Sequence, residues 1–170
     1  DLAEIMQDLD TNQRSALFQS LDLETAAGTL GESDPKLQRS LLETVGTEKA
    51  ADIVEEMPRD KAADLLADLP EEEASEILTK MDQKEAREVS ELLSYAEDSA
   101  GGLMTTEFIS TSGDILVKDL IEKMRGELPT AETIQYIFVI GEGGILRGVI
   151  TLKNLLLARP EQRIDEIMSE

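Results

Sequence analysis

Pairs of acidic residues four positions apart are the side chains in this sequence with the clearest capacity for chemistry. Asp64 and Asp68 form one pair, and Asp52 and Glu56 stand in the equivalent places 12 residues earlier. Residues at this spacing share one face of a helix, where two like charges repel by roughly 0.2–0.5 kcal/mol. Hard divalent cations prefer oxygen ligands, which carboxylates and water supply. The pairs are therefore candidate ligands of a divalent cation, with an ordinary solvated helix face as the alternative.

A 12-residue repeat provides the elements that position these acids. Between Ala50 and Leu93 it occurs four times, with mostly small or apolar residues at positions i, i+3, i+4 and i+7. This spacing predicts a short amphipathic helix in each unit. Pro58, Pro70 and Asp82 follow the last apolar residue of the first three units. We expect the helices to end there, because proline cannot continue a helix and aspartate favours turns.

Helices of about two turns cannot bury a core alone, so these units must stack on their neighbours. We predict a mainly α fold that begins with a right-handed superhelix of short helices over residues 1–95. The superhelix is expected to be of the armadillo or HEAT kind, with one helix for each 12-residue step. Stacking in this order predicts that the acidic pairs align into one stripe.

The same period extends toward the N-terminus. Ile5 keeps the register of the apolar positions, whereas Thr29 and Ser33 interrupt it. Gly28 and Gly31 lie beside this interruption, and glycine often marks a turn. The sequence therefore predicts a core position at Ile5 and a loosened turn near residues 28–33.

Composition narrows the class of partner. The 170 residues include 37 acidic and 16 basic side chains, for a net charge of −21. This balance argues against nucleic acid as a partner, because binding it requires basic groups, and it disfavours an anionic membrane surface. The acids serve either solubility or the attraction of metal cations. Cysteine and histidine are both absent from the sequence, which excludes disulfides and catalysis through imidazole or thiolate.

After residue 95 the pattern becomes that of a small α/β unit. Five elements are predicted in the order β-α-β-β-α, over residues 106–111, 117–124, 134–140, 146–151 and 152–157. Gly126 and Pro129 are expected to close the first helix. The glycine-rich run 141–144 lies between two strands rather than before a helix, which favours a hairpin turn over a phosphate-binding loop. Residues 164–168 are interpreted as the opening of a further unit.

Several stretches carry a family resemblance. Met104-Thr105-Thr106, the strand from Tyr136 to Ile140 and the run Gly148–Leu155 resemble the cystathionine-β-synthase (CBS) motif, a regulatory unit whose tandem pairs bind adenine nucleotides. With the acidic repeats before it, the junction Asp98–Thr105 and the run Glu132–Val139, nearly the whole chain resembles the cytosolic part of an MgtE-type magnesium transporter.

The resemblance implies a domain organisation and a set of partners. An acidic N domain is expected over 1–95, a junction over 96–103, a first CBS motif over 104–163 and the start of an incomplete second CBS motif over 164–170. The expected partners are a transmembrane pore domain absent from this sequence, the second CBS motif, and a second copy in a full-length homodimer. The full-length protein is expected to be a multi-pass membrane protein, with this region on the cytoplasmic side of the cell membrane.

The resemblance also implies a function and ligand sites. Magnesium bound between the N domain and the CBS motifs is expected to close the pore when the intracellular ion is plentiful. Asp64 and Asp68 match positions that ligate this ion in the family, and Glu32 is a further candidate on the same grounds. We therefore expect Mg²⁺ as the ligand of the acidic residues.

A nucleotide site is the second expectation from the CBS resemblance. Thr151 and Asn154 occupy the places of a Thr-x-x-Asp element that contacts the phosphate and ribose of an adenine nucleotide such as ATP. Asparagine lacks the charge that favours a bidentate grip on a ribose diol. Tyr136 is a candidate to stack on adenine and Lys153 to meet a phosphate. Alternatively, Tyr136 is an ordinary strand aromatic and Thr151 a strand end.

Two other functions stay open, and a third is disfavoured. The chain could be an adenine-nucleotide-binding CBS module in which the acids are incidental. It could also be an armadillo-like protein-interaction scaffold, although an attached CBS unit speaks against that. Catalysis by paired carboxylates requires a concave pocket that drives their pKa values apart, whereas these acids are expected on an exposed face. We therefore predict that the chain is not an enzyme.

Overall fold

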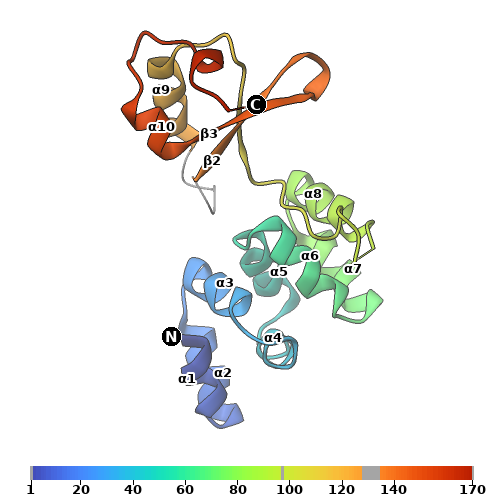
Figure 1. Cartoon of the computed structure of the whole chain (residues 1–170). Helices are drawn as coiled ribbons and strands as arrows, with labels where there is room; N and C mark the ends of the chain where they lie inside the picture. Colours follow the sequence, from blue (N-terminus) through green and yellow to red (C-terminus); the bar gives the residue numbers. More distant parts are fainter. Residues whose placement is uncertain (1, 97, 128–134, 170) are drawn as a thin grey trace. The chain divides into compact units, whose positions relative to one another are not determined.

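The computed structural model describes residues 2–96, 98–127 and 135–169. The chain divides into two compact units, residues 1–105 and 106–170, which are described in turn. Figure 1 shows the first unit as helical and the second as a small sheet with helices. The expected fold class, a superhelix of short helices followed by an α/β unit, is confirmed.

The first unit is built from short α-helices joined by tight turns. In the described part of the chain they are α1 (Leu2–Asp8), α2 (Thr11–Ser20), α3 (Leu23–Gly31), α4 (Pro35–Leu42), α5 (Thr47–Glu55), α6 (Arg59–Ala67), α7 (Glu71–Lys80) and α8 (Gln83–Leu93).

The residue that precedes each helix from α2 to α8 recurs every 12 residues. These N-cap residues are Asp10, Asp22, Asp34, Gly46, Pro58, Pro70 and Asp82. Each of the four aspartates accepts a hydrogen bond from at least one backbone N–H of the first helical turn, which satisfies donors that have no partner within the helix. The repeat therefore sets where each helix begins, and Pro58 and Pro70 stand between helices as predicted.

The turn expected near residues 28–33 begins only at Glu32, after the end of α3. Helix α3 runs unbroken through Gly28 to Gly31, and Thr29 and Ser33 are both buried. Their hydroxyls donate to main-chain oxygens four residues earlier, Thr29 to Thr25 at 2.7 Å and Ser33 to Thr29 at 2.6 Å. Because these bonds satisfy the buried hydroxyls, small polar residues replace apolar ones here without interrupting the repeat.

The prediction for Ile5 is also wrong. Its side chain is 52% exposed, whereas Ala3 and Met6 of the same helix are buried. Helix α1 spans only seven residues, so it buries two positions three apart and turns Ile5 away from the core.

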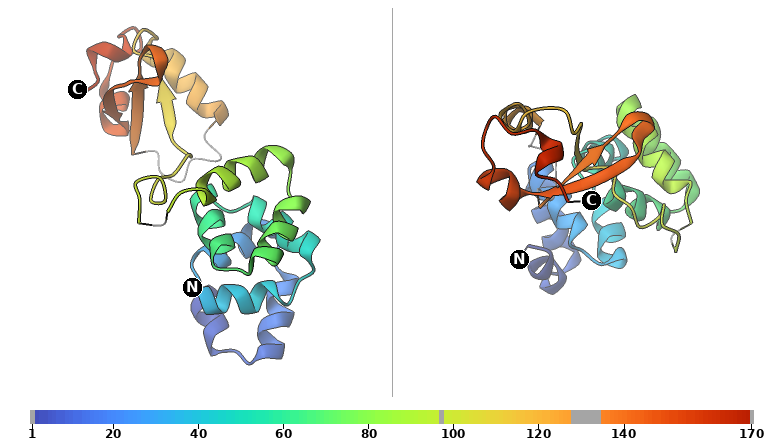
Figure 2. Two further views of the ribbon diagram at one scale, coloured as in Figure 1. Left: turned by 90° about the vertical axis from the view of Figure 1, so that its right-hand side faces the viewer. Right: turned by 45° about the horizontal axis from the view of Figure 1, so that its top comes forward.

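Helices two apart in the sequence pack against each other. Helices α1, α3, α5 and α7 form one row of contacts, while α2 packs on α4 and α6 packs on α8 (Figure 2). One core runs through the unit, with Met6, Phe18, Leu30, Leu41, Ile53, Met57, Leu65 and Leu66 among its fully buried side chains. The packing repeat is therefore a 24-residue pair of helices rather than a single 12-residue helix.

The second unit has the predicted β-α-β-β-α order. Its elements are β1 (Ile109–Thr111), α9 (Val117–Glu127), β2 (Tyr136–Ile140), β3 (Leu146–Thr151) and α10 (Leu152–Leu157), followed by a 3₁₀ turn at Ile164–Glu166. Strand β2 lies in the middle of the sheet, parallel to β1 and antiparallel to β3. Gly126, expected to close the first helix, lies inside α9, and Pro129 lies outside the described residues.

One face of the sheet packs against the helices. Ile137 and Val139 of β2 and Ile150 of β3 are fully buried in a core with Leu120 of α9 and Leu155 of α10. The run 141–144 forms the connection between β2 and β3, and its Gly143 and Gly144 have φ values of 71° and 78°. These positive angles explain the glycines and agree with the predicted turn.

The segment after α10 folds back onto the same unit. Ile164 is fully buried in its core, and Ser169 exchanges two backbone hydrogen bonds with Val149 of β3, at 2.8 and 2.9 Å. A side-chain Cβ on Gly148 would lie 2.6 Å from the Ser169 carbonyl oxygen. Glycine at 148 therefore allows this close return of the chain.

Candidate cation and nucleotide sites

Helix α6 carries three aspartates at successive four-residue steps. Asp64 lies in the middle of the helix, and Asp68 is its C-cap residue, whose N–H donates to the Asp64 carbonyl oxygen at 3.2 Å. Both side chains are exposed, as expected. Asp60 lies in the first turn of α6, so three carboxylates share one face of this helix. Sequence reasoning missed Asp60, although it stands four residues before Asp64 just as Asp64 stands before Asp68.

Asp60 is the most unusual of these acids. Its Oδ1 atom is buried and has no hydrogen-bond partner within the part of the chain that the structure describes. Buried polar atoms are nearly always paired with protein or water, so an orphaned carboxylate oxygen calls for a ligand. A cation or an ordered water would satisfy it.

Asp60 and Asp64 both line a small pocket within the helical unit. Its volume is about 40 Å³, and its other walls include Leu92, Tyr95 and Met104. This space is large enough for one or a few water molecules. Because Mg²⁺ retains several waters and uses few carboxylates, the two aspartates fit a partly hydrated cation at the pocket mouth. The fold thus places a recess beside the acidic face of α6.

Acidic residues also occupy the C-terminal ends of neighbouring helices. Glu32, Glu56 and Asp68 are the C-cap residues of α3, α5 and α6, and all three are exposed. The C-terminus of a helix carries partial negative charge, so an acid there is unfavourable by roughly 0.3–1 kcal/mol. A bound cation would reverse this penalty.

The structure does not gather all the predicted acids into one site. Asp52 and Glu56 belong to α5 and its C-cap, whereas Asp64 and Asp68 belong to α6 and its C-cap. Because α5 stacks on α3 and α7 while α6 stacks on α8, the two pairs lie in different rows of helices. The single stripe predicted from the 12-residue period is therefore wrong. Among the described residues, no three Asp or Glu side chains converge as a ready-made metal cage.

Basic side chains in this unit are used to hold helix ends together. Arg14 donates to the carbonyl oxygens of Met6 and Leu9 at 2.7 and 3.0 Å, and Lys49 donates to that of Gln19 at 2.8 Å. Residues 1–105 contain 26 of the 37 acids but only nine of the 16 bases. Much of the negative charge on this unit is therefore left for solvent or external cations.

The four candidate nucleotide residues meet at one end of the sheet. Tyr136 of β2 and Thr151 of β3 are direct cross-strand partners, and Tyr136 is 53% exposed. Thr151 is the N-cap of α10, where its Oγ1 accepts the N–H of Asn154 at 3.1 Å. Lys153 and Asn154 follow in the first turn of α10, and both are exposed. The residues that carry an aromatic ring, a hydroxyl, an amide and an ammonium group therefore come from neighbouring positions at one edge of the unit.

Comparison with known proteins identifies the family. Residues 1–98 match the sequence profile of the MgtE intracellular N domain, and residues 100–161 match that of the CBS domain. The first match alone covers more than half of the chain. The chain belongs to the MgtE family. The N domain in this profile is intracellular, in agreement with the location on the cytoplasmic side expected from the sequence.

Curated relatives in the MgtE family are longer than this chain. It is 30% identical over 168 residues to the magnesium transporter MgtE of Bacillus subtilis, which covers 99% of the chain and 37% of the relative. It is 44% identical over 78 residues to MgtE of Thermus thermophilus, which covers 46% of the chain and 17% of the relative. The chain thus spans little more than a third of the length of the Bacillus subtilis protein. These relatives are transporters, which agrees with the prediction that the chain is not an enzyme.

Solved structures show the same fold. The crystal structure of the soluble part of a magnesium transporter has a TM-score of 0.91 and 30% identity, covering 99% of the chain and 66% of that structure. The cytosolic domain of the Mg²⁺ channel MgtE in complex with ATP has a TM-score of 0.81 and 31% identity, covering 99% and 74%. Among the residues described in our structure, no helix combines the length and apolar character needed to cross a membrane.

Proposed function

We propose that this chain is the Mg²⁺-sensing regulatory region of a magnesium transporter. The observation that carries the proposal is that Asp60, whose buried Oδ1 has no hydrogen-bond partner among the described residues, lines a pocket together with Asp64. In this proposal the pocket binds a partly hydrated magnesium ion, and Asp68 at the helix end increases the local negative potential. Asp52, Glu56 and Glu32 contribute to a second acidic surface on the other row of helices.

The proposed mechanism is electrostatic. Without the ion, the acidic N domain and the CBS region repel each other and separate about the junction near residues 96–103. Bridging magnesium ions bind the closed arrangement better and shift the population toward it, which closes the pore. The proposed partners are the transmembrane pore domain, a second CBS motif and a second copy of the protein in a homodimer on the cytoplasmic side of the membrane.

Thermal unfolding in MgCl₂, compared with NaCl at matched ionic strength, tests the ion site. A specific site stabilises the folded chain by about 2.7 kcal/mol at 100 times Kd, which is a rise in Tm of about 10–15 °C for a unit of this size. We expect Asp60→Asn and Asp64→Asn each to reduce this response strongly. The double variant Glu71→Gln with Glu72→Gln is the matched control, because it removes exposed charges from α7 outside the pocket. Equal responses to the two salts in the unmodified chain would contradict a cation site here.

A second candidate function is adenine-nucleotide binding by the CBS unit. It is favoured by the direct pairing of Tyr136 with Thr151 and by a solved relative that is in complex with ATP. In this proposal Tyr136 stacks on the adenine, while Lys153 and the Thr151 hydroxyl contact phosphate. The Thr151 Oγ1 accepts the Asn154 N–H, so its proton remains available for donation.

Calorimetric titration with ATP tests this second function. We expect Tyr136→Ala to abolish the heat of binding and Tyr136→Phe to retain it, because phenylalanine keeps the stacking surface. Leu146→Ala serves as the control, since Leu146 is an exposed residue at the opposite end of β3 from Thr151. Unchanged binding in Tyr136→Ala would exclude the proposed adenine contact.

A further inference from the structure

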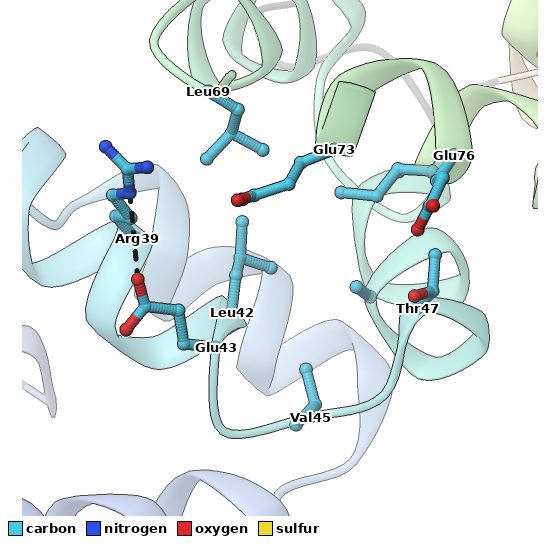
Figure 3. A pocket seen from close by; sticks show the side chains of 10 residues that line it. Arg39, Leu42, Glu43, Val45, Thr47, Leu69, Glu73 and Glu76 are labelled. Carbon is cyan, nitrogen blue, oxygen red and sulfur yellow. Dashed lines mark ion pairs between the residues drawn. The ribbon is translucent and has the colours of Figure 1, made fainter. Parts of the chain in front are cut away.

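A second pocket in the helical unit has a different character from the Asp60–Asp64 recess. It has a volume of about 200 Å³ and is lined by residues of α4, α5, α7 and the turns between helices. Its floor is apolar and includes Leu42, Val45, Leu69 and Ile77 (Figure 3). This volume is smaller than the roughly 300–1,000 Å³ of pockets that hold small-molecule ligands. It suits one side chain of the size of leucine or methionine.

Carboxylates surround this apolar floor. Glu43 pairs with Arg39 at 3.7 Å, and both side chains are largely exposed. In Figure 3, Glu73 extends over Leu42 toward Arg39, while Glu76 lies on the other side of the pocket near Thr47. The rim therefore has acidic groups on two sides of the apolar opening.

Glu73 and Glu76 have no ion-pair or hydrogen-bond partner through their side chains within residues 2–96, 98–127 and 135–169. Arg39 is the one basic residue among the pocket's described walls, and Glu43 already uses it. The rim thus keeps a net negative charge beside the half-buried side chains of Val45 and Leu69. Such a combination is complementary to a ligand that carries both an apolar side chain and flanking cations.

We propose that this pocket binds a basic peptide segment of a partner protein. One apolar side chain of the segment enters the pocket and contacts Leu42, Leu69 and Ile77. Lysine or arginine residues on either side of that anchor pair with Glu73 and Glu76. An apolar anchor in a desolvated pocket with a charged rim is the usual arrangement of a peptide hot spot. The excess of acidic residues over residues 1–105 steers such a cationic segment toward the unit.

This surface is separate from the proposed magnesium pocket, because the two share no lining residue. The proposal therefore stands whether or not the chain senses magnesium.

Fluorescence anisotropy with a labelled octapeptide tests the proposal. The probe has one central leucine with lysine and arginine on both sides, and the protein is the whole 170-residue chain in magnesium-free buffer. We expect Glu73→Gln with Glu76→Gln to weaken binding about tenfold, which corresponds to about 1.4 kcal/mol. The control is Glu71→Gln with Glu72→Gln, which removes the same charge from the same helix but not from the pocket. We expect it to change the affinity less than twofold.

The apolar anchor is tested on the peptide, which avoids disturbing the core of the protein. Replacing the central leucine by serine is expected to weaken binding at least fivefold. Equal binding of the leucine and serine peptides, or equal weakening by the two double variants, would show non-specific attraction of polycations and overturn the proposal. Thermal melts of both variants confirm that they are folded before binding is compared.

Discussion

Replacing Arg59 is expected to loosen three helices of the N domain at once. Arg59 begins α6, and its side chain is only 14% exposed. Its guanidinium group donates to the carbonyl oxygens of Glu55 and Met57 at 2.8 and 3.2 Å, at the end of α5. It also pairs with Glu85 at 3.0 Å and Glu88 at 3.4 Å on α8. The planar donor fork is what allows one side chain to serve four acceptors.

These contacts set the size of the effect. We take about 1 kcal/mol of net stability for each of the two carbonyl bonds. Glu85 and Glu88 are 30% and 39% exposed, so solvent reduces the ion pairs to about 0.5 kcal/mol together. Arg59→Met keeps most of the apolar side-chain volume and removes every donor. The expected loss of stability is about 2.5 kcal/mol, or a decrease in Tm of about 10–15 °C for a unit of this size.

Urea and thermal unfolding of the chain, followed by far-ultraviolet circular dichroism, measure this loss. The matched control is Arg39→Met, which removes an exposed ion pair with Glu43 whose side chains are 47% and 66% exposed. That pair is expected to contribute less than about 0.5 kcal/mol. If Arg59→Met lowered the Tm no more than Arg39→Met, the contacts of Arg59 would not hold the helices together and the reasoning would be refuted.

Three further predictions follow from particular contacts. Met6→Ser is expected to destabilise the helical unit by about 3 kcal/mol and Ile5→Ser by less than 0.5 kcal/mol, and equal effects in urea melts would contradict the orientation of α1. Gly148→Ala is expected to lower stability by about 1–3 kcal/mol and to speed amide exchange at Ser169, because its Cβ would overlap the returning chain. Hydrogen bonds from Thr25 hold the pKa of Asp22 below its usual 3.8, so the stability they provide is present above that value and is lost as the pH falls through the lower folded value. Asp22→Asn is expected to weaken the decrease in the free energy of unfolding at acidic pH. An unchanged pH dependence would show that Asp22 contributes nothing to it.

Much of the local structure follows directly from the sequence. The 12-residue spacing of apolar residues predicts the helices from α5 to α8, and Pro58 and Pro70 mark the boundaries between them. The glycines at 143 and 144 predict the turn between β2 and β3, since both adopt positive φ. These features depend on residues close together in the chain, so a short stretch of sequence contains all the information needed.

The sequence-based prediction was wrong where the pattern of polar and apolar residues did not reveal which contacts a side chain makes. Thr29 and Ser33 looked like an interruption, but their hydroxyls are satisfied by their own helix, and the repeat continues through them. Ile5 is apolar and in register, yet α1 buries Ala3 and Met6 and leaves Ile5 half exposed. Polarity alone does not determine burial, because a hydrogen bond can satisfy a buried polar group and an apolar residue can remain in solvent.

Tertiary structure alone decided which acids lie together. The sequence places Asp64 and Asp68 on one face of their helix, since that relation depends only on helical geometry. It does not show that α6 stacks on α8, which puts the pairs of α5 and α6 in different rows and places Asp60 in a pocket with Tyr95 and Met104. Those relations depend on how successive turns reverse the chain and on contacts between residues far apart in sequence. A 12-residue period indicates which face of each helix is apolar, and only the packing of the helices determines which faces meet.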